Sequence, residues 1–171
     1  MAEIHDALIQ SIADGLKSVD IPHEFIEEDD VFRFEIPLEG DFFQVQYLIG
    51  VRKADYIVRT SAPLRGDVDD DELFLKLATL TAKINRMIPR GNFDIDTDDG
   101  EISFRHCVES TGLETPSKEF ILSAIAIHQT MWNRFAPCFI NLFLNKSADV
   151  DDVLRSQKRV PEPDYETFFN L

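Results

Sequence analysis

The chain has 171 residues, of which 44% are hydrophobic and 29% are charged, so it is long and apolar enough to bury one core without disulfides or metal. Its formal net charge is -15. The resulting surface potential repels phosphate, which argues against nucleic acid and anionic membranes as partners and favours basic proteins.

The first half of the chain is predicted to be one helix followed by four strands. From Ala2 to Val19 apolar residues recur at every fourth position, as on one side of an amphipathic helix, and Pro22 ends it. Alternating apolar and polar side chains then predict strands at residues 23–28, 31–38, 42–52 and 56–61. Because their connections are short, these strands should form an antiparallel meander.

A second helix is expected to follow the loop at residues 63–69. The acidic run Asp69–Glu72 suits a helix N-terminus, where carboxylates accept free N–H groups. A core stripe follows at steps of four, three, four and three: Leu73, Leu77, Leu80, Ile84 and Met87. Pro89 and Gly91 then give the stop signal of a helix.

The segment from Gly91 to Val108 is predicted to be a β-hairpin. Each arm alternates apolar with polar residues, and Asp99-Gly100 between them suits a two-residue type I′ turn. The spacing of Asp94, Asp96 and Asp98 resembles the start of a calcium-binding EF-hand loop. The required glycine and glutamate are missing at its sixth and twelfth positions, so no metal site is expected.

The last helix starts at Thr115-Pro116-Ser117, runs to about Asn145, and should be kinked or restarted at Pro137. It carries two apolar stripes, one of Ile121, Ile125, His128, Trp132 and Phe135, the other of Phe120, Ala124, Ile127 and Met131. A helix at the edge of one sheet should bury only one stripe in its own core. The other should meet the far end of the sheet, the C-terminal tail or another chain. The candidate partner-binding residues are Phe120, Ala124, Ile127, Met131, Trp132 and Phe135, and a homodimer is expected.

The chain therefore divides into an α+β domain at residues 1–145 and a tail at residues 146–171. The tail is polar, with a short helix expected at residues 148–158, and ends in the aromatic segment Tyr165–Leu171. That segment either docks on the domain or is offered to a partner. The chain has no signal-peptide pattern and no membrane-spanning apolar run, so a cytoplasmic protein is expected.

No arrangement of residues typical of catalysis or of cofactor binding occurs in the sequence. Cys107 and Cys138 lack the spacing of metal ligands, and free thiols are expected. His106 and Cys107 are neighbours on one strand, so they point to opposite faces and cannot form a nucleophile pair. The seven glycines form no phosphate-binding loop. These observations favour a non-catalytic chain without a cofactor.

The order of elements and three local motifs resemble a known family. The motifs are Asn85 to Phe93 at the end of the second helix, Asp99-Gly-Glu-Ile-Ser-Phe-Arg105 in the hairpin, and Trp132-Asn-Arg-Phe-Ala-Pro137 in the last helix. Over residues 4–144 the sequence resembles the YbjN-type bacterial sensory transduction regulators, whose fold is that of type III secretion chaperones. The resemblance implies helices packed on a twisted antiparallel sheet, frequent dimers, and no enzymatic activity or catalytic residues.

Three functions are compatible with the sequence. The first is a protein-binding or regulatory domain without catalysis, with a protein partner. The second is a chaperone for one exported client protein, and the third is a small-molecule sensor with a pocket between the sheet and the last helix. The sequence does not distinguish among them, because secretion-chaperone folds share an architecture and not a site.

Overall fold

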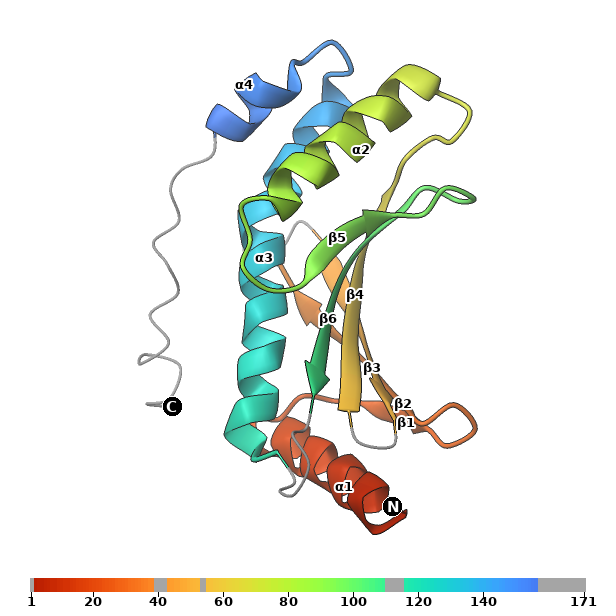
Figure 1. Cartoon of the computed structure of the whole chain (residues 1–171), viewed down its shortest axis with the longest axis vertical. Helices are drawn as coiled ribbons and strands as arrows, with labels where there is room; N and C mark the ends of the chain where they lie inside the picture. The colour runs from red at the N-terminus through yellow and green to blue at the C-terminus, as the bar shows by residue number, and fades with distance from the viewer. Residues whose placement is uncertain (1, 39–42, 53–54, 110–115, 157–171) are drawn as a thin grey trace.

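The structure is a computed structural model that describes residues 2–38, 43–52, 55–109 and 116–156, and it confirms the predicted α+β fold. The elements are α1 (Ala2–Ser18), β1 (Glu24–Ile26), β2 (Val31–Pro37), β3 (Gln44–Val51), β4 (Asp55–Arg65), α2 (Asp71–Asn85), β5 (Asn92–Ile95), β6 (Glu101–Glu109), α3 (Lys118–Leu144) and α4 (Val150–Arg155). Figure 1 shows α3 running along one side of the sheet, with α1 near the N-terminal end of α3 and with α2 and α4 near its C-terminal end.

The described strands form one antiparallel sheet of six strands in the order β1-β2-β3-β4-β6-β5. The predicted hairpin therefore extends the meander through its second arm, β6, and its first arm, β5, is an edge strand. β4 continues to Arg65, beyond the predicted end at residue 61, and its register with β6 is irregular between Ser61 and Arg65. Pro63 is tolerated inside this strand because it lies in the irregular stretch, where ladder hydrogen bonds are interrupted.

Phe93 of β5 is the centre of the aromatic core. Its ring centroid lies 4.8 Å from that of Phe104 on β6, and 5.2, 5.8 and 5.5 Å from those of Trp132, Phe135 and Phe139 on α3. All five side chains are fully buried. Aromatic pairs at these separations stabilise a core beyond the area that they bury. The edge strand, the adjacent strand and the long helix are thus joined through one side chain.

Asn85, the last residue of α2, closes the free edge of β5. Its Nδ2 donates to the Phe93 carbonyl and its Oδ1 accepts the Phe93 N–H, both at 2.8 Å. An edge strand would otherwise present these two groups unpaired. The side-chain amide therefore takes the place of a neighbouring strand and fixes the end of α2 to the sheet.

The turn between β5 and β6 differs from the predicted two-residue turn. The Asp96 N–H donates to Glu101 O at 2.9 Å and the Gly100 N–H donates to Asp96 O at 3.0 Å, which makes residues 97–100 a four-residue loop. Gly100 has a φ of 71°, whereas Asp99 is not among the residues with positive φ. A type I′ turn would require positive φ at both positions. Instead, the Asp96 and Asp99 carboxylates accept the N–H groups of Asp98 and Glu101.

Helix α3 is continuous through Pro137, so the predicted restart of the helix at this residue is wrong. Met87 lies after the end of α2 and is 47% exposed, so it does not continue the core stripe. The short helix predicted in the tail is α4, whose buried Val150 and Val153 pack it against the domain. The aromatic segment Tyr165–Leu171 lies outside the described residues. Within the described ranges, no helix has the length and hydropathy to cross a membrane.

Replacing Gly100 by valine should lower the free energy of unfolding by about 2 kcal/mol or more, because a β-branched residue resists positive φ. A side chain there would also overlap the backbone of Gly66, whose N–H donates to Gly100 O at 2.7 Å. Urea denaturation measures the loss. Thr97→Ala, in the same exposed loop, is the control and should change little. Equal stabilities of the two variants would contradict this account of the turn.

Replacing Asn85 by alanine should lower the free energy of unfolding by about 2 kcal/mol or more, because Phe93 would lose the partners of two backbone groups. Asn85→Asp should be similarly destabilising at pH 7, since a carboxylate oxygen would face the Phe93 carbonyl. Arg86→Ala, at the exposed next position, is the control. The measurement is urea denaturation, and a neutral Asn85→Ala would show that the edge of β5 needs no partner.

Candidate functional site

One face of the sheet carries none of the described helices (Figure 1). We call this the open face. It is lined by the strand residues that alternate with the core: Val31, Arg33, Glu35, Gln46, Leu48, Gly50, Ile57, Arg59, Ser61, Ser103, Arg105 and Cys107. Ser103 is buried among its neighbours, and the others are half-buried or exposed.

Three arginines lie in one row across the open face. Arg33 is paired with Leu48, Leu48 with Arg59, and Arg59 with Arg105 in the registers of β2, β3, β4 and β6. Directly paired residues point to the same side of a sheet. The arginine side chains are 51%, 46% and 58% exposed. A protein with a net charge of -15 thus presents a basic row in the middle of this face.

A mostly apolar row runs beside the arginines. Val31 is paired with Gly50, Gly50 with Ile57, and Ile57 with Cys107. Val31 and Ile57 are half-buried and Cys107 is exposed. Leu48, which belongs to the arginine row, adjoins the apolar row along β3. The two rows together expose apolar side chains beside guanidinium groups, a combination common in protein interfaces.

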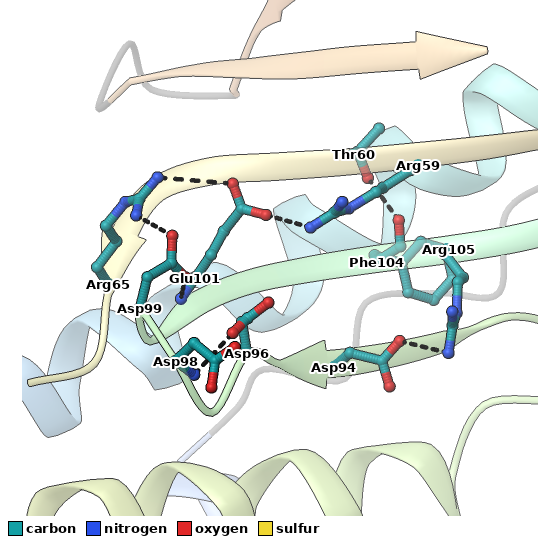
Figure 2. A network of polar contacts seen from close by, with 10 residues as sticks. All are labelled: Arg59, Thr60, Arg65, Asp94, Asp96, Asp98, Asp99, Glu101, Phe104 and Arg105. Atoms are coloured by element: carbon teal, nitrogen blue, oxygen red, sulfur yellow. Dashed lines mark hydrogen bonds and ion pairs between the residues drawn. The ribbon is translucent and has the colours of Figure 1, made fainter. Parts of the chain in front are cut away.

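Carboxylates at the edge of the open face balance part of this basic charge (Figure 2). Glu101 forms ion pairs with Arg59 and, at 3.9 Å, with Arg65. Asp99 forms an ion pair with Arg65. The pKa of Asp99 is lowered mainly by the hydrogen bond from the Glu101 N–H and, to a smaller extent, by the Arg65 guanidinium. These pairs connect the end of β4 to the hairpin loop on the solvent side of the sheet.

The edge strand is joined to the same network by one further pair. Arg105 of β6 lies 3.0 Å from Asp94 of β5, which is visible in Figure 2. Asp94 and Asp99 are therefore engaged with arginines, and Asp96 accepts the Asp98 N–H at 2.8 Å. Among the described residues, no group of three His, Cys, Asp or Glu side chains is arranged to hold a metal ion.

On the opposite face, a polar cluster lies between β4 and α3. Trp132 Nε1 donates to Thr60 Oγ1 at 2.8 Å, His128 Nδ1 lies 2.8 Å from the same oxygen, and Phe104 O lies 3.2 Å from it. The single hydroxyl proton of Thr60 points to the carbonyl or to the ring. In either case His128 Nε2 has no hydrogen-bond partner. Burial of such a group without a partner makes the site sensitive to proton binding.

His106 faces this cluster from β6. Its ring centroid lies 6.2 Å from that of His128, and its buried Nδ1 also has no hydrogen-bond partner. The pKa of His128 lies well below its usual value, mainly because the ring is buried and to a smaller extent because of the charge on His106. Burial and the Arg90 charge lower the pKa of His106. Both rings are therefore mainly neutral at pH 7. Cys107 is exposed on the other face of the strand.

Most of the predicted partner-binding residues are in the core of the chain. Five of the six are buried, namely Ala124, Ile127, Met131, Trp132 and Phe135, and Phe120 is 50% exposed. The expectation that α3 can bury only one stripe is wrong, because both stripes apart from Phe120 are buried, and α3 contacts α1, β4, β6, α2 and α4. A partner could reach only Phe120 among the six without opening the core. The homodimer itself stays a prediction.

The comparisons with known proteins find similarity to solved structures. No model of a known protein family matches the chain, and a search of curated proteins finds no significant match. Among solved structures, the chain is similar to a crystal structure of the ExsC-ExsE complex. The sequences are 17% identical, the TM-score is 0.47, and the match covers 78% of this chain and 96% of the other. The resemblance to YbjN-type proteins thus stays a prediction.

Sequence reasoning did not find the open face as a candidate site. The alternation placed Gln44 and Gln46 on a polar face of the strand predicted at residues 42–52, and this was the available signal. The arginine row could not be seen, because its members lie on three strands and become neighbours only through the register. A prediction based on the most apolar helix instead selected residues of the core.

Stability should fall as the pH falls below about 6.5, the ordinary histidine pKa. Folding lowers the pKa of both histidines, so the unfolded chain binds more protons than the folded one. The contribution of each neutral histidine to the free energy of unfolding is therefore complete above its unfolded pKa and is lost as the pH falls below that value. The buried His128 can remove up to about 1.4 kcal/mol per pH unit, and His106 removes less because solvent reaches it and screens its charge. Urea denaturation at pH 7.5 and 5.5 measures this loss. His106→Gln should reduce the pH dependence, and equal stability of the wild type at both pH values would contradict the assignment.

Proposed function

We propose that this chain is a non-catalytic protein-binding domain that holds a segment of another polypeptide on its open face. The observation that carries the proposal is the row of Val31, Ile57 and Cys107 next to three exposed arginines on a face without a helix. The buried centre of a protein–protein interface is more apolar than the rest of the surface, and arginine is enriched in interfaces. A partner segment would cover the apolar row and contact the guanidinium groups.

Two forms of this function are compatible with the sequence. In the first, the chain is a regulatory domain that binds a protein of a signalling pathway. In the second, it is a chaperone that keeps an exported client bound before transport. Both need a surface for a polypeptide and no reacting groups, and we place that surface on the open face. We further propose that the protein acts in the cytoplasm and that two copies associate, with Phe120 at their contact.

A small-molecule sensor with a pocket between sheet and α3 has less support. In the described residues this interface is filled by Phe93, Phe104, Trp132 and Phe135, which are fully buried. A ligand would have to displace aromatic side chains that contact one another. Ligand pockets are usually formed before the ligand arrives. The open face needs no such displacement to accept a partner.

The proposal is tested by selection from a random 12-residue peptide library on the whole chain, followed by fluorescence anisotropy. Peptides selected on the wild type should bind the Leu48→Glu/Ile57→Glu variant at least about tenfold more weakly, because charges would replace two apolar contacts. Leu75→Glu is the control, since Leu75 is 68% exposed on α2. It should leave the affinity unchanged.

Two results would overturn the proposal. One is that no peptide binds saturably, and the other is that the selected peptides bind the double variant and the wild type equally. Circular dichroism checks that the double variant is folded. If it is not, Cys107→Glu replaces it, because Cys107 is exposed on the same face. Light scattering on the same samples measures whether two copies associate.

A further inference from the structure

One short segment of the C-terminal tail carries an acidic residue at every second position. From Glu162 to Glu166 the sequence reads Glu-Pro-Asp-Tyr-Glu, and this segment lies outside the described residues. Pro161 and Pro163 disfavour a helix and bias the residue before each of them toward extended backbone. Successive side chains of an extended segment point to opposite sides. The sequence therefore predicts carboxylates along one side of this segment, with Pro163 and Tyr165 along the other.

The open face presents two rows that match these two sides. The arginine row and the apolar row cross the same four strands, and they are two residues apart along each strand. That separation is about 7 Å in a sheet. A segment lying between the rows, at right angles to the strands, would point one set of alternate side chains at the guanidinium groups. The other set would face Ile57 and its apolar neighbours.

The two patterns also agree in length. Arg33 and Arg105 lie on strands three spacings apart, and three spacings of about 4.8 Å make about 14 Å. Glu162 and Glu166 are four residues apart, which is also about 14 Å in an extended chain. Asp164 would then lie within about 3 Å of the level of Arg59. A long arginine side chain can bridge that offset.

We infer that residues 162–166 of a second copy of this chain lie across the open face, with their carboxylates on the arginine row and Tyr165 on the apolar row. The inference rests on the proposed function, because it uses the same surface for a polypeptide. It adds that the protein supplies its own occupant. A foreign partner would then have to displace this segment before it could bind.

The carboxylates of the open face do not exclude this contact. Each arginine of the row has one acidic neighbour: Glu24 for Arg33, Glu101 for Arg59 and Asp94 for Arg105. Ion pairs as exposed as these are weak, and a guanidinium has five N–H donors, so it can bind a second carboxylate. The repulsion that follows from the net charge of -15 is screened over about 8 Å at physiological salt. Direct contacts at the arginine row can therefore outweigh it.

The position of α4 favours the tail of a second copy over the chain's own tail. α4 packs against α2 and α3, on the side of the sheet away from the open face (Figure 1). Glu162 is seven residues beyond Arg155, the last residue of α4, and seven extended residues span at most about 25 Å. Within that length the chain would have to pass a helix layer about 10 Å thick, round the edge of the sheet and reach the middle of the opposite face.

The test mixes two forms of the full chain. One is ¹⁵N-labelled and carries Glu162→Gln, Asp164→Asn and Glu166→Gln, so its own tail lacks the carboxylates. The other is unlabelled wild type. Only the labelled form is observed, so amide shifts at Ile57 and Arg59 report a tail from another copy. Saturable shifts are expected, and the unlabelled form of the triple variant should bind at least about tenfold more weakly, because it offers no charge-assisted contact.

Substitutions in the labelled form test the arginine row. Arg59→Gln should weaken binding at least about tenfold, because it removes the central guanidinium. Arg86→Gln is the matched control, since it makes the same change at an exposed position at the end of α2, and it should retain the affinity. Circular dichroism checks the fold, and Arg33→Gln replaces an Arg59→Gln variant that does not fold. Added salt should weaken the binding, because it screens the attraction.

The inference is overturned if mixing causes no shifts, if the shifts are confined to the surroundings of Phe120, or if both unlabelled forms bind equally. It is also overturned if mixing has no effect while the open-face amides of the wild type and the triple variant differ at every dilution. The chain's own tail would then be the occupant. Library-selected peptides separate these failures from that of the proposed function. If they need Leu48 and Ile57 although mixing causes no shifts, the open face binds other polypeptides and not this tail.

Discussion

The insertion of Phe93 into the aromatic core is the contact on which the arrangement of the chain depends. Phe93 belongs to a strand of four residues at the sheet edge, and its ring contacts two elements, β6 and α3. The Asn85 side-chain amide forms hydrogen bonds with the backbone N–H and carbonyl of Phe93, which fixes the end of α2 to β5. An exposed edge strand this short has little stability of its own. Its side chain and backbone are held from two sides, so α2, the hairpin and α3 are fixed relative to one another.

That arrangement also decides which side of the sheet is free. Because α3 packs along β4 and β6 and contacts α1, α2 and α4, the described helices gather on the side of the aromatic core. The strand residues that point the other way have no helix to cover them. They carry arginines that are partly balanced by Glu101, Asp99 and Asp94, and an apolar row interrupted by a glycine. The proposed function uses this free side.

The two faces respond differently to charge. On the core side, neutral histidines lie in a site that disfavours their protonated forms, so acid weakens the contact between sheet and α3. On the open face, charged groups are in contact with water, where ion pairs are weak and can exchange partners. A binding surface needs the second property, since its side chains must release their neighbours to meet another protein.

Local patterns in the amino-acid sequence were sufficient for the α+β class, the meander and the long helices, because the side-chain periods of strands and helices are visible within a few residues. The two strands of the hairpin were also predicted correctly, but the two-residue turn between them was not. The choice between two and four loop residues depended on carboxylates of Asp96 and Asp99 that accept nearby N–H groups. The burial of both α3 stripes apart from Phe120, the place of β5 at the edge, and the rows of the open face followed from contacts between residues far apart in the chain. Such contacts have no local signature, and Arg33, Arg59 and Arg105 become neighbours only when the strands pair in this register.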